Sequence, residues 1–390
     1  MNKKIKILLV GLGSEIGSTL LSLLKFDSEN IEITGILTNK IFKNNIKKNF
    51  EAIISRVILS DPSMVNSMNY SEKNSLLMIN KKQIKIYWGD IKKFKISNIK
   101  FSYDATVIAT SKDHINNKIL MKKFLKISNF VFGVAESTNL PSIYPNLINT
   151  QSEIFEKKPN SIYDFKDKIF ALGSCQTNGW QSQLRVIVET FKKLKVDNLK
   201  MKGCELDIVH PDTPQGRLGT KSMDPREQDA RNNLRPGFSQ VEKSMKKIFK
   251  TSHLKNTISL RTLINPPGYQ IARFYISYTL KNKKNITKEN FKKEIINFCK
   301  KNKFKIQYTE SSLGSRAFEK VESSAVLLLN DKYYHFNKNF LDQSKKDVEI
   351  LQIVFQSYVH NTRGYCRSVI ETIKDVISRY KKRKIIYCWK

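Results

Sequence analysis

The sequence has few cysteines, few acidic residues and no long apolar run. Its 390 residues include five cysteines, at positions 175, 204, 299, 366 and 388, which are too few and too scattered for a disulfide framework or a zinc cluster. We therefore expect no metal site and a reducing, cytoplasmic location. No apolar stretch reaches the length that crosses a bilayer, so we expect no membrane partner. The first ten residues meet Gly11 and Gly13 without a cleavage-like site, which favours a strand over a signal peptide.

The scarcity of acidic residues leaves a formal net charge of +34, from 69 Lys and Arg against 35 Asp and Glu. The basic residues are spread along the chain, with no basic arm and no repeat of aromatic and basic residues. That distribution favours a solvated basic surface over a nucleic-acid partner, although anionic ligands would still be attracted. Apolar residues make up 40% of the chain, enough for two domains with cores of their own.

A glycine turn follows the first apolar run, Lys4 to Val10. Its sequence is GLGSEIG at 11–17, and an amphipathic helix comes next. A strand, a glycine turn and a helix form the context of a dinucleotide site, although the third glycine arrives one position late for the usual G-x-G-x-x-G. The residues predicted to contact the cofactor here are Gly11, Gly13, Ser14, Glu15 and Ile16.

The second predicted strand, 31–37, ends in Thr38, Asn39 and Lys40. A site for NAD usually has an acidic residue at this point, and none is present. The three side chains suit the 2′-phosphate of NADP better, so NADP is favoured over NAD. A buried strand over 103–110 is predicted to bring Thr110 and Ser111 to the same cofactor.

Alternating strands and helices continue as far as Leu172 and predict a doubly wound parallel sheet. Beyond Cys175, strands outnumber helices, as in an α+β domain with a mostly antiparallel sheet. An amphipathic helix is expected over 364–380. The predicted division is a Rossmann-type NAD(P)-binding domain over 1–174, completed by 361–390, and a catalytic domain over 175–360.

Cys175 lies between a strand-like run, 168–172, and a helical pattern over 181–195. Backbone N–H groups at the start of a helix favour the thiolate over the thiol, so the position predicts a nucleophile. A second strand, 201–209, delivers His210 as a candidate base.

The order of these parts is itself informative. The glycine turn is followed by Ala109-Thr110, then by Ser174-Cys175-x-Thr177-Asn178, by Val209-His210, by an arginine-bearing loop and by Asn361 before a final helix. In this order the chain resembles the glyceraldehyde-3-phosphate dehydrogenase family over essentially its whole length. The resemblance implies a glycolytic type of reaction and a homotetramer.

The resemblance also implies roles for single residues. Cys175 would attack an aldehyde carbonyl to give a thiohemiacetal, and His210 would act as the base. The backbone N–H of Cys175 would stabilise the oxyanion, and Asn361 would hold the nicotinamide amide.

For the phosphate groups of the substrates, the resemblance points to a wider set of polar residues. These are Ser174, Gln176, Thr213, Arg226, Ser239 and Arg261. The chain departs from the family at Gln176, Gln215 and Gln240, where the family has threonine, aspartate and glycine.

Three functions remain open from the sequence. The first is oxidation of a phosphorylated aldehyde such as glyceraldehyde 3-phosphate, with inorganic phosphate as second substrate. The second retains the cysteine chemistry but uses water or a different aldehyde, for example erythrose 4-phosphate. The third is a basic binding protein without catalytic activity.

Overall fold

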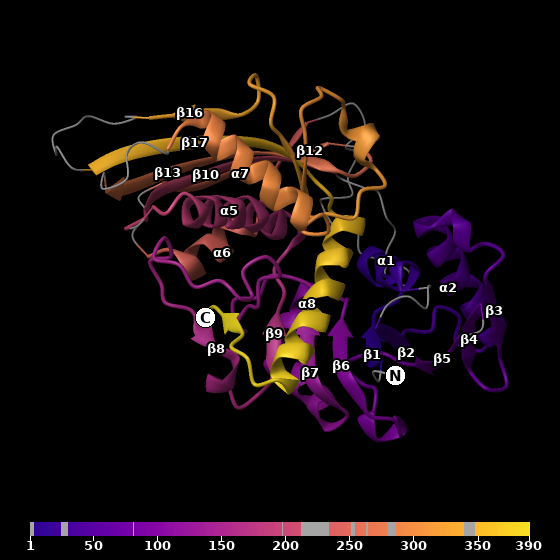
Figure 1. Ribbon diagram of the computed structural model, residues 1–390. Helices are drawn as coiled ribbons and strands as arrows, with labels where there is room; N and C mark the ends of the chain where they lie inside the picture. The colour runs from indigo at the N-terminus through magenta and orange to yellow at the C-terminus, as the bar shows by residue number, and fades with distance from the viewer. Residues whose placement is uncertain are drawn as a thin grey trace.

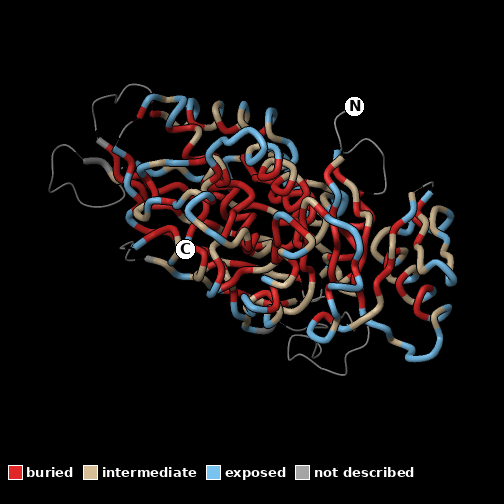
Figure 2. The backbone as a smooth tube through the Cα atoms, turned by 90° about the horizontal axis from the view of Figure 1, so that it is seen from below, coloured by how far each residue is buried: buried red, intermediate tan, exposed pale blue. Residues whose placement is uncertain are grey.

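The protein folds around two large β-sheets with helices packed against them (Figure 1). The computed structural model describes residues 4–24, 30–80, 82–196, 198–211, 234–250, 254–262, 264–279, 286–338 and 348–390. Buried segments run through both sheets and through the helices beside them (Figure 2).

The first sheet is formed by the N-terminal part of the chain, in the order β3-β4-β5-β2-β1-β6-β7-β9. From β5 to β9 all neighbouring strands are parallel, whereas β4 is antiparallel to β3 and β5. After β1, the strands β2 to β5 are added on one side of β1, and β6, β7 and β9 are then added on the other side. The strands are β1 (Ile5–Val10), β2 (Ile31–Thr38), β3 (Met68–Ser71), β4 (Leu76–Ile79), β5 (Lys82–Trp88), β6 (Tyr103–Ile108), β7 (Ser128–Gly133) and β9 (Ile169–Ala171).

The helices of this half differ in part from the sequence prediction. They are α1 (Glu15–Leu23), α2 (Ile46–Ser60), α3 (Lys112–Asn116) and α4 (Lys118–Lys122), followed by a 3-10 turn at Lys123–Lys126. The sequence over 114–126 reads as one helix, but the structure breaks it at Asn117, which has an extended backbone and caps α4 through its side chain. Helix α2 was not predicted, although Phe50, Ile53 and Val57 give it a buried face at helical spacing.

The second sheet has the order β11-β12-β10-β13-β17-β15-β14, with β16 also paired to β17. Most neighbours are antiparallel, but β10–β12 and β14–β15 are parallel. The predicted α/β class, with parallel and antiparallel sheets, is therefore confirmed. The strands are β10 (Lys200–Pro211), β11 (Arg235–Gly237), β12 (Leu254–Thr262), β13 (Gly268–Thr279), β14 (Ile306–Thr309), β15 (Ala325–Leu328), β16 (His335–Asn337) and β17 (Val348–Val359).

Three helices accompany the second sheet, namely α5 (Cys175–Lys193), α6 (Val241–Ile248) and α7 (Lys288–Lys301). Helix α5 begins at Cys175, earlier than the helical pattern over 181–195 indicated, because its first turn is polar yet buried. It lies so close to β17 that a Cβ on Gly179 would stand 2.5 Å from a methyl carbon of Val359. Glycine is therefore required for this packing.

The C-terminal helix α8 (Arg363–Lys381) returns to the first half of the molecule and lies beside α1 (Figure 1). Its buried residues Val369, Ile370 and Ile373 belong to the same core as Leu20 and Leu21 of α1. After it, β18 (Tyr387–Cys388) pairs with β8 (Asn160–Ser161). Segments from opposite ends of the chain thus share one core.

Candidate active site

Cys175 occupies the first position of α5, directly after the end of β9. Ser174 is the N-cap and accepts a hydrogen bond from the backbone of Thr177 at 3.2 Å. Gly173 has a φ of +71°, a left-handed conformation that favours glycine, and its carbonyl accepts from the hydroxyl of Tyr365 at 2.6 Å. The turn that presents the cysteine is therefore fixed from both sides.

His210 lies one residue before the end of β10 and faces the cysteine. Its Nε2 is 3.7 Å from Sγ of Cys175. Its Nδ1 is 2.6 Å from the carbonyl oxygen of Pro211, and a carbonyl can only accept, so Nδ1 carries the proton. Nε2 is then an acceptor that can take the proton of the thiol. The structure brings together the two residues that the sequence places 35 positions apart.

Burial raises the pKa of the Cys175 thiol to about 11, although the charge of Arg261 and nearby backbone N–H groups lower it. The expectation that the helix start favours the thiolate is wrong for this structure, because desolvation of the sulfur outweighs those effects. The resting form is the thiol, and its activation requires a base.

Asn361 links the imidazole to a chain of buried amides. Its Nδ2 is 3.1 Å from Nε2 of His210, and its Oδ1 accepts from Nε2 of Gln176 at 3.1 Å. Gln270 in turn donates to the backbone carbonyl of Gln176 at 2.9 Å. Gln176 was predicted to contact phosphate, but here its amide is bonded to protein groups, while Asn361 orients the histidine.

Gln270 was missed by the sequence analysis. It is fully buried on the inner face of β13, between apolar neighbours such as Ala272. A polar residue at an inward position of an otherwise apolar alternation is the signal that would have found it.

Arg261 lies beside His210 in the pairing of β10 with β12. Its side chain is buried, and one Nη donates to the carbonyl of Phe238 at 3.2 Å. Ser239 is also buried and accepts from the backbone of Val241 at 3.3 Å, while Gln240 precedes α6 as its N-cap. A buried arginine thus lies near the sulfur and acts on it electrostatically. Thr213, Gln215 and Arg226 lie outside the described residues.

The glycine turn lies between β1 and α1, where the order of the first sheet reverses. Gly11 has a φ of +98°, and a Cβ there would stand 2.6 Å from the carbonyl oxygen of Ala109. At Gly17 a Cβ would be 2.2 Å from the carbonyl oxygen of Gly11, so helix and turn pack directly on each other. Ser14 caps α1 by accepting from Gly17, and Gly13 and Ile16 are half-buried.

The glycine turn is close to the cysteine. Glu15, in the first turn of α1, acts electrostatically on Cys175, and Ile16 accepts a hydrogen bond from Cys366 at 3.6 Å. Burial raises the pKa of Glu15, against the opposing effect of Arg56.

The other predicted cofactor residues surround the same turn. Gly11 donates to the carbonyl of Leu37 at 2.9 Å, which places it next to the end of β2. Thr38 there is buried, whereas Asn39 and Lys40 are exposed. Thr110 touches the turn and its hydroxyl is 3.1 Å from Nδ1 of His114, and Ser111 is the N-cap of α3.

A buried polar network supports the start of α5 and was also missed. The hydroxyls of Ser174 and Thr177 are 2.9 Å apart, and Thr177 is 3.1 Å from Ser244, which donates to Glu136. The carboxylate of Glu136 is fully buried and pairs with Lys247 at 3.0 Å. These residues lie in different elements, and no local pattern connects them.

Within the described parts of the chain, no cluster of three or more His, Cys, Asp or Glu side chains is arranged to hold a metal ion. None of the described helices combines the length and apolar character needed to span a membrane. No protein-family model matches this chain, and no curated protein is significantly similar to it in sequence.

Proposed function

We propose that this protein is an NAD(P)-dependent aldehyde dehydrogenase that oxidises a phosphorylated aldehyde through a covalent Cys175 intermediate. The observation on which the proposal depends is the 3.7 Å separation of the Cys175 sulfur and the His210 Nε2, at a helix start beside a glycine turn. A half-buried thiol, an oriented imidazole and a nearby arginine are the groups that such a reaction needs.

The strand order β5-β2-β1-β6-β7-β9 supports a Rossmann-type assignment for the first sheet. Dinucleotides bind such sheets at the carboxyl ends of the strands where the order reverses. The glycine turn lies at this point, and its glycines let the turn pack directly on the start of α1, where a pyrophosphate would bind. The residues present therefore fit the cofactor. We assign residues 1–174 with 361–390 to cofactor binding and 175–360 to catalysis.

In this proposal, His210 first takes the proton of Cys175, and the sulfur attacks the aldehyde carbon. The backbone N–H groups at the start of α5 stabilise the oxyanion that forms. Nε2 of His210 then returns that proton to the oxyanion, which gives the hydroxyl of the thiohemiacetal, and takes it up again when the hydride departs, since Nδ1 is held by Pro211. A bound nicotinamide supplies the hydride acceptor. Arg261 provides the positive charge for a substrate phosphate.

The departures at Gln176 and Gln240 favour a second candidate within the same chemistry. Gln176 is committed to Asn361 and Gln270, and Gln240 caps α6 where the family has glycine. Such a site would resolve the thioester with water, or accept a longer aldehyde such as erythrose 4-phosphate.

Absorbance of reduced nicotinamide tests both candidates. Purified protein is mixed with NAD or NADP and with glyceraldehyde 3-phosphate or erythrose 4-phosphate, with and without inorganic phosphate. Turnover that requires phosphate favours the first candidate, and turnover without it favours the second. Absence of turnover with every combination would contradict the dehydrogenase proposal and leave a binding protein.

The matched variants are Cys175→Ser and Cys299→Ala, which change a reacting and a remote buried cysteine. We expect the first to abolish turnover while coenzyme binding persists, and the second to leave turnover unchanged. Sedimentation of the same samples tests the homotetramer that the resemblance implies.

A further inference from the structure

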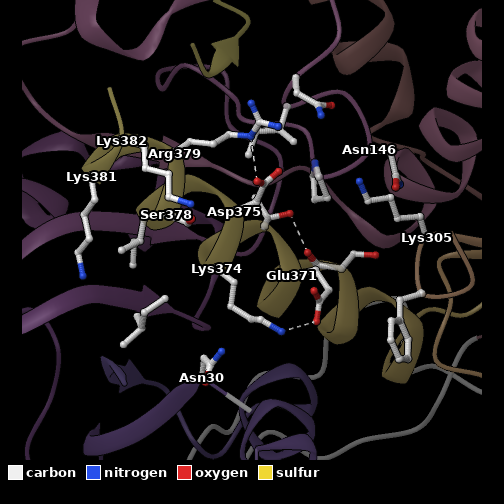
Figure 3. A pocket seen from close by; sticks show the side chains of 18 residues that line it. Asn30, Asn146, Lys305, Glu371, Lys374, Asp375, Ser378, Arg379, Lys381 and Lys382 are labelled. Carbon is white, nitrogen blue, oxygen red and sulfur yellow. Dashed lines mark hydrogen bonds and ion pairs between the residues drawn. The ribbon is translucent and has the colours of Figure 1, made fainter. Parts of the chain in front are cut away.

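A cavity of about 760 Å³ lies along α8, and Cys175 does not line it. One wall is the C-terminal half of α8, and the other is formed by 145–149 and by the turn that joins α7 to β14 (Figure 3). None of its lining residues belongs to the proposed active site. Its volume is in the range of small-molecule sites, which measure about 300–1,000 Å³.

Basic side chains outnumber acidic ones around the cavity. The lining includes Lys305, Lys374, Arg379, Lys381 and Lys382, against Glu371 and Asp375. Both carboxylates are already neutralised, because Glu371 pairs with Lys374 at 3.0 Å and Asp375 with Arg379 at 2.9 Å. Lys381 lies 3.8 Å from Asp104, so the positive charge without a nearby carboxylate is that of Lys305 and Lys382.

Lys305 is the central basic group, since it is half-buried and enters from the wall opposite α8 (Figure 3). Among the described residues, no carboxylate lies within ion-pair distance of Lys305 or of Lys382. Burial lowers the pKa of Lys305, and the charge of nearby Arg185 lowers it further. A buried cation next to other cations is costly unless an anion joins it.

Asn146 adds a hydrogen-bond acceptor to the basic groups of the cavity. It is 2% exposed, and its Nδ2 donates to the carbonyl of Asn178 at 3.0 Å and to the hydroxyl of Ser182 at 2.7 Å. Its Oδ1 is buried and has no hydrogen-bond partner among the described residues, although Asn146 lines the cavity. An unsatisfied buried acceptor requires a donor, such as a hydroxyl group.

Apolar residues complete the wall. Phe304, Ile148 and Pro145 also line the cavity. A ligand with only charged groups would leave this apolar surface exposed to water, whereas the carbon skeleton of a larger ligand would cover it.

We infer that this cavity binds a phosphate ester of sugar or nucleotide size, with its phosphate on Lys305, Arg379 and Lys382 and a hydroxyl on Asn146. This site goes beyond the proposed dehydrogenase reaction and does not depend on it. Sugar phosphates and nucleotides both carry a phosphate on a hydroxylated skeleton, and two probes distinguish these two classes of ligand. Ribose 5-phosphate represents a sugar phosphate, and AMP adds a base for Phe304.

Calorimetric titration of the full chain with ribose 5-phosphate, AMP and inorganic phosphate tests the inference. We expect saturable binding of at least one ester, at least tenfold tighter than inorganic phosphate. Lys305→Gln should weaken it about tenfold, because a charged hydrogen bond is lost from a half-buried site. Lys301→Gln removes the same charge from an exposed position in α7 and should have no effect.

Acylation of lysines, followed by mass spectrometry, locates the ligand without any activity assay. The bound ester should protect Lys305 at least fivefold and leave Lys301 unprotected. Equal affinity for inorganic phosphate, equal effects of the two substitutions, or protection elsewhere with Lys305 still reactive would each overturn the inference. None of these readouts requires Cys175, so failure here and failure of the dehydrogenase proposal are distinguishable.

Discussion

At the scale of single residues, the decisive property is that Cys175 rests as a thiol. Burial raises its pKa to about 11, and Nε2 of His210 is an acceptor 3.7 Å away. The pair is thus arranged for proton transfer during the reaction rather than for a standing ion pair. Desolvation slows oxidation of the sulfur, because the thiolate is the reactive form.

The rate of alkylation of Cys175 should therefore depend on pH as it does for a thiol of high pKa. With iodoacetamide, we expect the rate to rise with pH through the alkaline range toward a midpoint near 11. Peptide mass spectrometry measures modification of Cys175, and the other four cysteines, which are buried, act as internal controls. A plateau beginning near neutral pH would contradict this expectation, since it would show a thiolate–imidazolium pair.

The charge of Arg261 lowers the pKa of Cys175, so its removal has a predictable sign. Arg261→Gln should shift the alkylation profile to higher pH and slow the reaction at any fixed pH below the midpoint. Arg273→Gln is a matched control, because Arg273 pairs with Asp207 at 2.7 Å on the same sheet and does not act on the thiol. Identical profiles for Arg261→Gln and the unaltered protein would refute the proximity of the arginine.

The reacting residues could be predicted from the sequence because they follow recognisable elements in a recognisable order. Cys175 follows a strand and starts a helix, and His210 lies near the end of a strand. Gln270 and Glu136 could not, because their partners are distant in the chain and the contacts depend on how the two sheets pack. The high pKa of the thiol was mispredicted for the same reason, since burial is a tertiary property.

At the scale of elements, α5 is fixed by a glycine and by a buried ion pair. A Cβ at Gly179 would lie 2.5 Å from Val359, whose branched side chain cannot easily turn away. We expect Gly179→Ala to lower the free energy of unfolding by about 1–3 kcal/mol, measured by urea denaturation. Gly314→Ala is the control, because nothing lies within 4 Å of its Cβ position.

A double substitution separates steric overlap from other effects. If the clash is the cause, Gly179→Ala with Val359→Ala should cost less than the sum of the two single changes. Additive costs would show that the close approach of α5 and β17 is not what makes glycine necessary.

The ion pair beneath α5 should be more important than any surface pair. Lys247 is 11% exposed and donates to Glu136 at 3.0 Å and to the carbonyl of Ser137 at 2.6 Å. Lys247→Met should destabilise the fold by about 3–5 kcal/mol, because the fully buried Glu136 carboxylate loses its counter-charge. Urea denaturation measures the change, and Lys246→Met, in the exposed pair with Glu242, should cost less than about 0.5 kcal/mol. Similar costs for the two variants would contradict a structural role for the buried pair.

Helices and strands whose apolar residues recur at a regular spacing were predicted most accurately from the sequence. The helix over Gly364 to Tyr380 and the strands around His210 agree closely with α8 and β10. The start of α5 was misplaced because its first turn is buried but polar, so periodicity did not extend to it. Position 117 broke a predicted helix because asparagine there caps the next one.

At the scale of the whole molecule, buried thiols make the fold sensitive to alkali. Burial raises the pKa of Cys204, Cys299 and Cys388 from 9.0 to about 12. Above pH 9 the unfolded chain loses these protons and the folded chain does not, so the free energy of unfolding falls as pH rises. The loss should be complete only above the folded values, near pH 12.

Urea denaturation at several pH values from about 8 to 11 measures this loss. High salt should be present throughout, because it screens the repulsion of lysines, whose deprotonation would otherwise stabilise a chain of net charge +34. Cys204→Ala should flatten the slope, since one of the three thiols no longer titrates. A midpoint that stays constant across this range would contradict the burial of the thiols.

The parallel or antiparallel character of each sheet was predictable from the sequence, whereas the packing of the sheets was not. Alternating strands and helices before Leu172 and strand-rich sequence after Cys175 indicated one parallel and one largely antiparallel sheet. The parallel pairing of β10 with β12 depends on a crossover through α6, which strand spacing alone does not reveal. The cavity along α8 is lined by segments far apart in the chain, from Ile5 to Lys382, and no local sequence pattern predicts it.

The return of α8 to the first core has a consequence for biosynthesis. Strand β9 ends at residue 171, but the helix that covers Leu20 and Leu21 begins only at residue 363. Until the ribosome has synthesised α8, the apolar surface that this helix covers stays exposed to water. Chaperones act on exposed apolar surface of this kind. The first core therefore cannot be completed until nearly the whole chain has been synthesised.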